Sequence, residues 1–318
     1  MSTAPAPRRK HYHTLKTYAC ALLALGIGGI VPAYCSASIY KEQKACGLQP
    51  PLPSPDRSDA LSQQLAFFTL GGLRSLVAEI YTLDATDAWS KRDWPRLRSR
   101  WESATTLMPR RLNYWINAEN DMTSNAAGDV IRNRKLSRSE QENAYREYIK
   151  LGENFLLEGI ANNPQSWKLY TALAEHYGNL YRLPQFDKAI DTMKKAIELG
   201  APEYYKRVLF YNLCRVPGRE QEAWQLGRSL FENEMHRVPS VHFLLFALQN
   251  KIQVPAAEAL SIDQLYRTDA GETEEEVLQR AIREIELFSN NDLLYPTYGV
   301  KEFLQKHATT AENELRPD

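Results

Sequence analysis

The side chains that usually carry out chemistry are spread along this 318-residue sequence in patterns that suit few reactions. The six histidines are His11, His13, His176, His236, His242 and His307. Two of them, His236 and His242, lie six residues apart across Pro239, so they do not share one helical face as zinc ligands would. The sequence contains no Gly-x-Ser-x-Gly, phosphate-binding or dinucleotide-binding motif. We therefore predict no catalytic residue, no metal site, no cofactor and no enzymatic activity.

Two charged runs have structural interpretations that compete with chemical ones. In "GETEEEV", Thr273 is placed to cap the start of a helix and Glu276 to complete a capping box. The run "KRDWPRLRSRW", residues 91–101, mixes arginine with tryptophan, a combination that also stacks on nucleic-acid bases. However, Trp101 is needed for packing between helices, and residues 41–318 carry 35 bases against 39 acids. The run therefore indicates a solvated face, with an acidic protein or phospholipid as the alternative contact, and we expect no nucleic-acid partner.

The first 40 residues have the pattern of a membrane anchor. The leader, residues 1–16, holds four bases, and residues 1–40 contain no acid. The next 24 residues, 17–40, are uncharged; as a helix they would reach about 36 Å, enough to cross a hydrocarbon core of about 30 Å. A basic leader before a single span predicts a cytoplasmic N-terminus and a C-terminal domain outside the cytoplasmic membrane. The alternatives are a signal peptide cleaved near residues 35–37, which gives a secreted or periplasmic protein, and a lipoprotein, for which Tyr34 is too bulky.

The rest of the chain divides into three parts. Residues 41–60 are rich in proline and predict a semi-rigid linker. Residues 61–254 read as successive helices, and residues 255–318 as a C-terminal helical cap. The predicted breaks between helices are at Pro109, Pro164, Pro202, Pro239 and Pro255.

Two details of this part leave alternatives open. The apolar stretch 65–85 is either a second membrane span or a helix that caps the folded domain, and the charges of Arg74 and Glu79 near its middle favour the cap. Cys46 and Cys214 would meet an oxidising compartment, but 168 positions separate them. No spacing supports a disulfide bond between them, so free or buried thiols are the simpler expectation.

The stretch between Pro164 and Pro202 has the pattern of a helical hairpin. Apolar and small residues recur at helical spacing in both halves: Tyr170, Leu173, Ala174 and Tyr177, then Ala189, Met193 and Ala196. Because alanine lets two helices approach closely, we expect Ala174, Ala189 and Ala196 to be buried. The spacing resembles the tetratricopeptide repeat, a helix–turn–helix unit of about 34 residues, with three extra residues in the turn.

The same template fits other stretches less well. Before Pro109, its packing positions fall on Ala85, Trp101 and Ala104. A further unit begins at Trp115 and ends with Gly152, Leu156, Gly159 and Pro164, with about 21 additional residues between its halves. A fourth, within residues 204–231, matches only weakly. These patterns together predict an all-α fold, a right-handed solenoid of antiparallel helical hairpins.

A narrower resemblance rests on three segments: "FFTLGGLRSLVAEIYTLDATDAW", "NYWINAENDMTSNAA" and "LLEGIANNPQSWKLYTALAEHYGNLY". They are similar to a group of membrane-anchored, tetratricopeptide-like bacterial proteins of unassigned function. In that group a Leu-Gly-Gly-Phe-Arg-like segment precedes the first hairpin; here Leu73 stands in place of the phenylalanine. The resemblance covers roughly residues 65–235. It implies a fold and membrane attachment, and no chemistry.

In tetratricopeptide repeats the first helices of the hairpins line a concave groove. Carried onto this chain, the repeat pattern places partner-binding residues at Thr82, Thr86, Trp89, Asn113, Asn120, Lys168 and Glu175. The resemblance thus implies a membrane-anchored, non-catalytic scaffold for a protein or peptide partner. The alternative function is an accessory subunit of an envelope enzyme complex or of a secretion or assembly machine.

Overall fold

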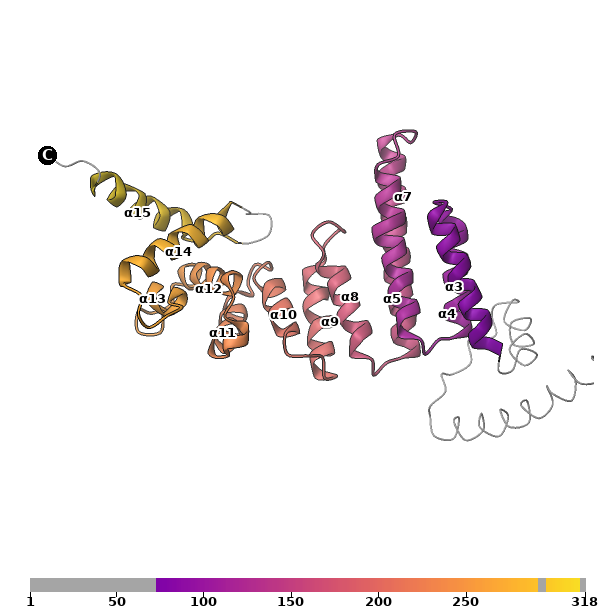
Figure 1. The fold of residues 1–318 in the computed structure, drawn as a ribbon, viewed down its shortest axis with the longest axis horizontal. Helices are drawn as coiled ribbons and strands as arrows, with labels where there is room; N and C mark the ends of the chain where they lie inside the picture. The colour runs from indigo at the N-terminus through magenta and orange to yellow at the C-terminus, as the bar shows by residue number, and fades with distance from the viewer. Residues whose placement is uncertain (1–72, 291–295, 315–318) are drawn as a thin grey trace, which may run out of the picture. The chain divides into compact units, whose positions relative to one another are not determined.

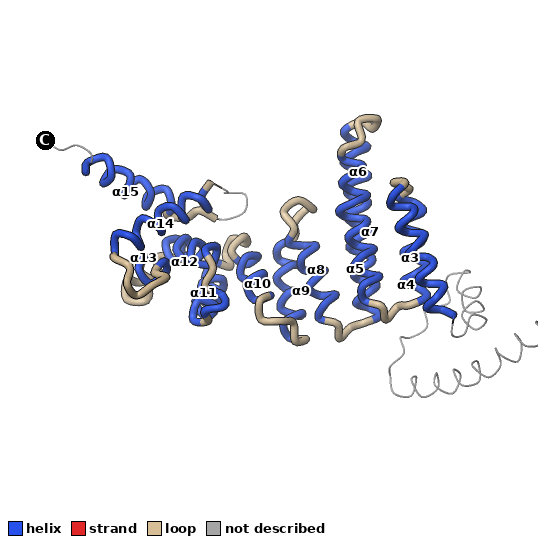
Figure 2. The backbone as a smooth tube through the Cα atoms, viewed as in Figure 1, coloured by secondary structure: helices blue, strands red, loops and turns tan. Residues whose placement is uncertain are grey.

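The computed structural model describes residues 73–290 and 296–314, and in these ranges the protein is all-α (Figure 1, Figure 2). The helices, labelled as in Figure 1, are α3 (Arg74–Ser90), α4 (Trp94–Leu107), α5 (Leu112–Asn120), the π-helix η2 (Asp121–Ala126), α6 (Ala127–Ile131), α7 (Arg138–Asn162), α8 (Trp167–Gly178), α9 (Phe186–Glu198), α10 (Tyr205–Leu213), α11 (Glu220–Glu232), the 3-10 turn η3 (Glu234–His236), α12 (Pro239–Lys251), α13 (Ile262–Tyr266), α14 (Glu274–Ser289) and α15 (Val300–Glu314).

Several predictions concern residues before this part. The basic leader 1–16, the membrane segment 17–40 and the linker 41–60 lie outside the described residues. Across the described ranges, no helix combines the length and the apolar character that crossing a bilayer requires. The contacts divide the chain into a first unit that ends at Ala118 and a second unit that begins at Glu119, so the boundary falls inside α5.

The five predicted breaks are confirmed by the positions of the prolines. Three of them separate helices: Pro109 lies between α4 and α5, Pro164 between α7 and α8, and Pro202 between α9 and α10. Pro239 is the first residue of α12, where its missing N–H costs no helical hydrogen bond. Pro255 follows the end of α12.

In the first unit, α3 and α4 pack against each other as a hairpin. Helix α3 contributes small side chains to this contact: the residues that it buries are Ala78, Ala85 and Ala88. The α4 side includes Trp101 and Ala104, both buried. The predicted packing role of Ala85, Trp101 and Ala104 is therefore confirmed.

In the second unit, α8 and α9 form the hairpin that the sequence predicts (Figure 1). Ala174, Ala189 and Ala196 are 0% exposed, as expected where two backbones approach closely. The three extra residues belong to the connection between Gly178 and Phe186. There the backbone of Leu183 takes a positive φ of 62°, a conformation that few non-glycine residues adopt.

The second unit stacks its helices in two rows. Side chains join the end of α5, α8, α10 and α12, the first members of successive hairpins, through the pairs Glu119–His176, Asn212–Gly178 and Tyr211–Ser240. In the other row, Lys194 Nζ of α9 lies 2.5 Å from Glu222 Oε1 of α11. These side chains link α5 to α8, α8 to α10, α10 to α12 and α9 to α11.

The additional residues in the repeat that begins at Trp115 lengthen a hairpin. They form the end of η2, helix α6 and the first half of α7, which is 25 residues long. Helix α7 starts at a capping box, in which Ser137 Oγ accepts from the Glu140 N–H and Glu140 Oε2 accepts from the Ser137 N–H. The cap fixes the start of α7 at Arg138. The inserted residues therefore lengthen the first arm of the hairpin, through α6, and the second arm, through the first half of α7.

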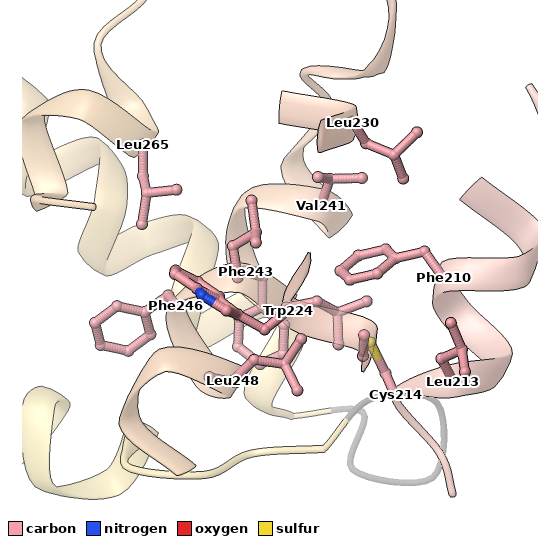
Figure 3. Close-up of a cluster of buried hydrophobic side chains, with 14 of the residues drawn as sticks. Phe210, Leu213, Cys214, Trp224, Leu230, Val241, Phe243, Phe246, Leu248 and Leu265 are labelled. Atoms are coloured by element: carbon pink, nitrogen blue, oxygen red, sulfur yellow. The ribbon is translucent and has the colours of Figure 1, made fainter. Parts of the chain in front are cut away.

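The main apolar core of the second unit lies between α8 and α15 and is drawn in part in Figure 3. Helix α12 is its centre, with six consecutive buried residues from Phe243 to Leu248. Phe210 from α10 and Trp224 from α11 also enter this core. Cys214 belongs to it as a free thiol, and burial raises the pKa of its Sγ–H. The predicted C-terminal cap, from residue 255, is helical in its described part.

Replacing Thr273 by alanine is expected to lower the free energy of unfolding of α14 by about 1 kcal/mol. Thr273 Oγ1 accepts from the Glu276 N–H at 3.3 Å, and Glu276 Oε2 accepts from the Thr273 N–H at 2.8 Å, so the predicted capping box is confirmed. Hydrogen exchange of residues 274–289 measures the loss. Thr273→Ser keeps the hydroxyl and should behave as the wild type; equal protection in both variants would contradict the role of the cap.

Candidate functional site

The candidate site is built around a change of helix type in the second unit. Between α5 and α6 the chain forms η2, a π-helix from Asp121 to Ala126. The backbone at both ends of η2, at Asn120 and Ala127, keeps α-helical angles, so the π segment is a wider turn within one continuous rod. Such segments shift the register of the side chains and are frequent at functional sites. Across the start of η2, Thr123 Oγ1 lies 2.9 Å from Glu119 Oε1.

Glu119 is the centre of a buried polar cluster. Glu119 is only 6% exposed. Besides Thr123, His176 Nδ1 of α8 lies 2.9 Å and Arg182 Nη1 lies 2.7 Å from Glu119 Oε1. The tautomer of His176 that carries its proton on Nδ1 suits this contact, because a carboxylate oxygen accepts hydrogen bonds. Three donors thus replace the water that this buried carboxylate loses on folding.

A second buried carboxylate, Glu153 of α7, holds α8 from its other side. Tyr177 Oη donates to Glu153 Oε1 at 2.7 Å, and Lys150 Nζ donates to Glu153 Oε2 at 2.8 Å. Desolvation alone would raise the pKa of Glu153. The hydrogen bonds from Lys150 and Tyr177, together with the positive charge of Lys150, outweigh it and lower the pKa. Desolvation and the neighbouring Glu153 raise the pKa of the Tyr177 hydroxyl, which remains a donor.

The two carboxylates fix α8 through consecutive residues. His176 reaches Glu119 and Tyr177 reaches Glu153, so one turn of α8 is bonded both to the end of α5 and to α7. Helix α7 and η2 also lie close together, since a Cβ added to Gly152 would lie 2.3 Å from Thr123 Cγ2. The cluster is therefore a rigid support for the outer side of α8.

Within this cluster the polar side chains are engaged with one another. Ser124 Oγ accepts from Arg182 Nη2 at 2.5 Å and donates to Asn120 Oδ1 at 2.9 Å. His176 Nδ1 faces Glu119, so this serine and this histidine do not form the contact that activates a serine nucleophile. In the ranges that the structure describes, no three His, Cys, Asp or Glu side chains gather as a metal site would need.

Above this support, α8 and the start of α10 form a mixed aromatic and charged surface. We call it the α8–α10 face and define it as Trp167, Lys168, Glu175, Tyr204 and Tyr205. The rings of Trp167 and Tyr205 meet edge to face at 6.0 Å, and those of Tyr204 and Tyr205 lie 4.3 Å apart. Lys168 Nζ lies 5.7 Å from the Trp167 ring. Tyr204 is 45% exposed, and Lys168 and Glu175 are exposed as well.

The surroundings of this face raise the pKa values of two of its residues, Glu175 and Tyr205. Desolvation and the nearby charge of Glu119 raise the pKa of Glu175. Desolvation, followed by the hydrogen bond with Tyr204, raises the pKa of Tyr205 to about 12. Tyr205 also bonds with Thr171, which lies between Lys168 and Glu175 on the same side of α8. The face thus combines a lysine, a carboxyl group and a cluster of aromatic rings.

The structure places the predicted groove residues in both units. Four belong to the first unit: Thr82, Thr86, Trp89 and Asn113. Thr82 and Thr86 bond within α3, where Thr86 Oγ1 donates to the Thr82 carbonyl, and Trp89 and Asn113 are exposed. Three belong to the second unit: Asn120, Lys168 and Glu175. All three are exposed; Asn120 is bonded to Ser124, and Lys168 and Glu175 share the α8–α10 face.

Sequence reasoning missed the residues that support and complete the face. Glu119, His176 and Arg182 are up to 63 positions apart, and nothing in their local pattern marks them as partners. Tyr204 and Tyr205 fall in the stretch where the repeat template fits weakly. The adjacent tyrosines before an apolar helical pattern were the one available signal for them.

The chain was also compared with known proteins. Neither a protein-family model nor a curated protein matches this sequence. Its function must therefore be inferred from the fold and from the site itself.

Proposed function

We propose that the protein is a non-catalytic, tetratricopeptide-like scaffold whose second unit binds a protein or peptide partner through the α8–α10 face. In this proposal the hairpins form a right-handed solenoid, and the first helices line its groove. The two rows of helices in the second unit support this arrangement, as does the burial of alanines at the expected positions. Attachment to the cytoplasmic membrane through residues 17–40 remains a prediction from the sequence.

The observation that carries the proposal is the contrast between the inner and outer sides of α8. Inward, His176 and Tyr177 are buried and bonded to carboxylates of other helices. Outward, the same helix presents exposed Lys168 and Glu175 beside Tyr204. Tyrosine and tryptophan are enriched at the energetic centres of protein interfaces, and charged residues are common at the polar rim around them.

The test is quantitative affinity capture from detergent extracts of membranes that contain the protein. The full chain is compared with the double variant Lys168→Glu/Tyr204→Ala. A matched control, Lys195→Glu/Tyr181→Ala, changes one lysine and one tyrosine that are exposed on α9 and on the α8–α9 connection.

We expect a partner that is recovered equally by the wild type and the control and about tenfold less by the face variant. Since all four substituted side chains lie on the surface, helical content should be unchanged in both variants. The proposal is wrong if no protein is recovered reproducibly, or if the face variant captures the partner as well as the control does.

A further inference from the structure

Helix α3 of the first unit has two apolar sides. One side buries Ala78, Ala85 and Ala88 against α4. The other consists of large aliphatic residues that remain exposed: Leu73 is 56%, Leu76 56%, Ile80 54% and Leu83 70% exposed. We call these four residues the α3 stripe. Because they follow one another at three, four and three positions, they fall within one narrow sector of the helix surface.

An apolar stripe of this kind is unusual on a surface that faces water. Single exposed leucines are common, but four aligned large side chains form a contiguous patch, and such patches mark sites of association with proteins or membranes. Packing within the first unit does not require the stripe, because the alanine side already provides the contact with α4. Its presence therefore points to something outside the hairpin.

Basic side chains lie along one border of the stripe. Asp84 and Asp87 adjoin it on the helix surface, and each is paired with bases: Asp84 with Arg96 and Arg100, and Asp87 with Lys91 and Arg96. Desolvation would raise the pKa of Asp84, but the two arginines outweigh it and lower that pKa. On the other border, Glu79 Oε1 accepts from Tyr114 Oη at 2.8 Å.

The charge of the described part of the first unit is positive. Residues 73–118 contain eight bases against five acids. Lys91 and Arg92, at the turn that ends α3, are both exposed. An apolar stripe with bases beside it matches a surface that is apolar beneath and negatively charged on top, which is the structure of an anionic lipid monolayer.

We propose that α3 lies along the surface of an anionic lipid bilayer, with the α3 stripe inserted among the acyl chains and the basic side chains at the level of the headgroups. In this orientation the helix axis is parallel to the membrane plane. A second copy of the chain is the less favoured occupant. Four side chains along about 15 Å of helix give a contact well below the roughly 800 Å² per partner of a stable dimer.

The experiment places a nitroxide spin label on the stripe of the full chain. Ile80→Cys is labelled after Cys20, Cys35 and Cys46 are replaced by serine; Cys214 is retained, because it is buried and its raised pKa keeps the thiol unreactive. The protein is reconstituted in nanodiscs of phosphatidylcholine with about one-quarter phosphatidylglycerol. Relaxation by oxygen, which concentrates in lipid, is compared with relaxation by a water-soluble nickel chelate.

We expect oxygen to relax the label at Ile80 more strongly than nickel does. A label at Ser75, exposed on the same helix but off the stripe, should show the reverse. In phosphatidylcholine alone the Ile80 label should move toward the aqueous pattern. In the same anionic nanodiscs, the double variant Lys91→Glu/Arg92→Glu should also shift the Ile80 label toward the aqueous pattern.

Three results would overturn the proposal. The first is a label at Ile80 that nickel reaches as readily as it reaches the label at Ser75. The second is a label shielded from both agents equally in every lipid, which would mean that protein, either the preceding segment of the chain or a second copy, covers the stripe. The third is spin–spin broadening between labels at Ile80 of two chains, which identifies a dimer contact.

Discussion

The second unit is expected to lose about 3 to 5 kcal/mol of stability when Glu119 is replaced by alanine. The carboxylate accepts from Thr123, His176 and Arg182, and its removal takes away the acceptor that these three side chains share in a buried place. Buried polar groups that lose their partner cost far more than surface pairs do. Chemical denaturation in detergent measures the total loss, and hydrogen exchange in α8 shows where it arises.

The matched control is Glu198→Ala. Glu198 also forms an ion pair, with Lys195 Nζ at 3.0 Å, but both side chains are exposed to water. Removing such a pair is expected to change stability by less than about 1 kcal/mol. If Glu119→Ala and Glu198→Ala have the same effect, the buried cluster does not hold α8 in the way the structure indicates.

A second large effect is expected where the arms of the longest hairpin meet. Replacing Gly152 by valine should destabilise the second unit by about 3 kcal/mol. Even a single Cβ at this position would lie 2.3 Å from Thr123 Cγ2 and 3.2 Å from the Glu119 carbonyl oxygen. The backbone oxygen cannot move without disturbing η2, so the helices must separate. Chemical denaturation again gives the size of the loss.

A second substitution tests the cause of this loss. In the background of Gly152→Ala, Thr123→Ser removes the colliding methyl group and keeps the hydroxyl that bonds to Glu119. We expect this pair to regain most of the stability that Gly152→Ala loses. Gly271→Ala is the neutral control, since the nearest atom that its Cβ would meet, Asp269 Oδ1, is 3.8 Å away. No recovery in the double variant would show that a different contact is limiting.

The parts of the fold that sequence reasoning predicted are those encoded locally. A proline ends or begins a helix through its own ring, so Pro109, Pro164 and Pro202 could be interpreted one at a time. The burial of Ala174 and Ala189 follows from a spacing within a single hairpin. Both kinds of signal require only neighbours in the sequence.

The parts that were missed depend on residues far apart in the sequence. His176 and Glu119 are separated by 57 positions, and each alone resembles an ordinary helical residue. The π-helix, Asp121–Ala126, has no composition that distinguishes it from an α-helix. A repeat template assigns Lys168 and Glu175 to one side of α8, and their role in a groove stays a prediction. The template fits poorly at Tyr204 and does not select this residue.

The adjacent anchors of α8 also bear on how the chain acquires its structure during synthesis. Glu119 and Glu153 both precede His176 and Tyr177 in the sequence, so each acceptor leaves the ribosome before the donor that it will bind. The end of α5, together with η2, α6 and α7, can therefore form first and offer both carboxylates to the next helix. Helix α8 thus finds both of its hydrogen-bond acceptors already synthesised when it emerges.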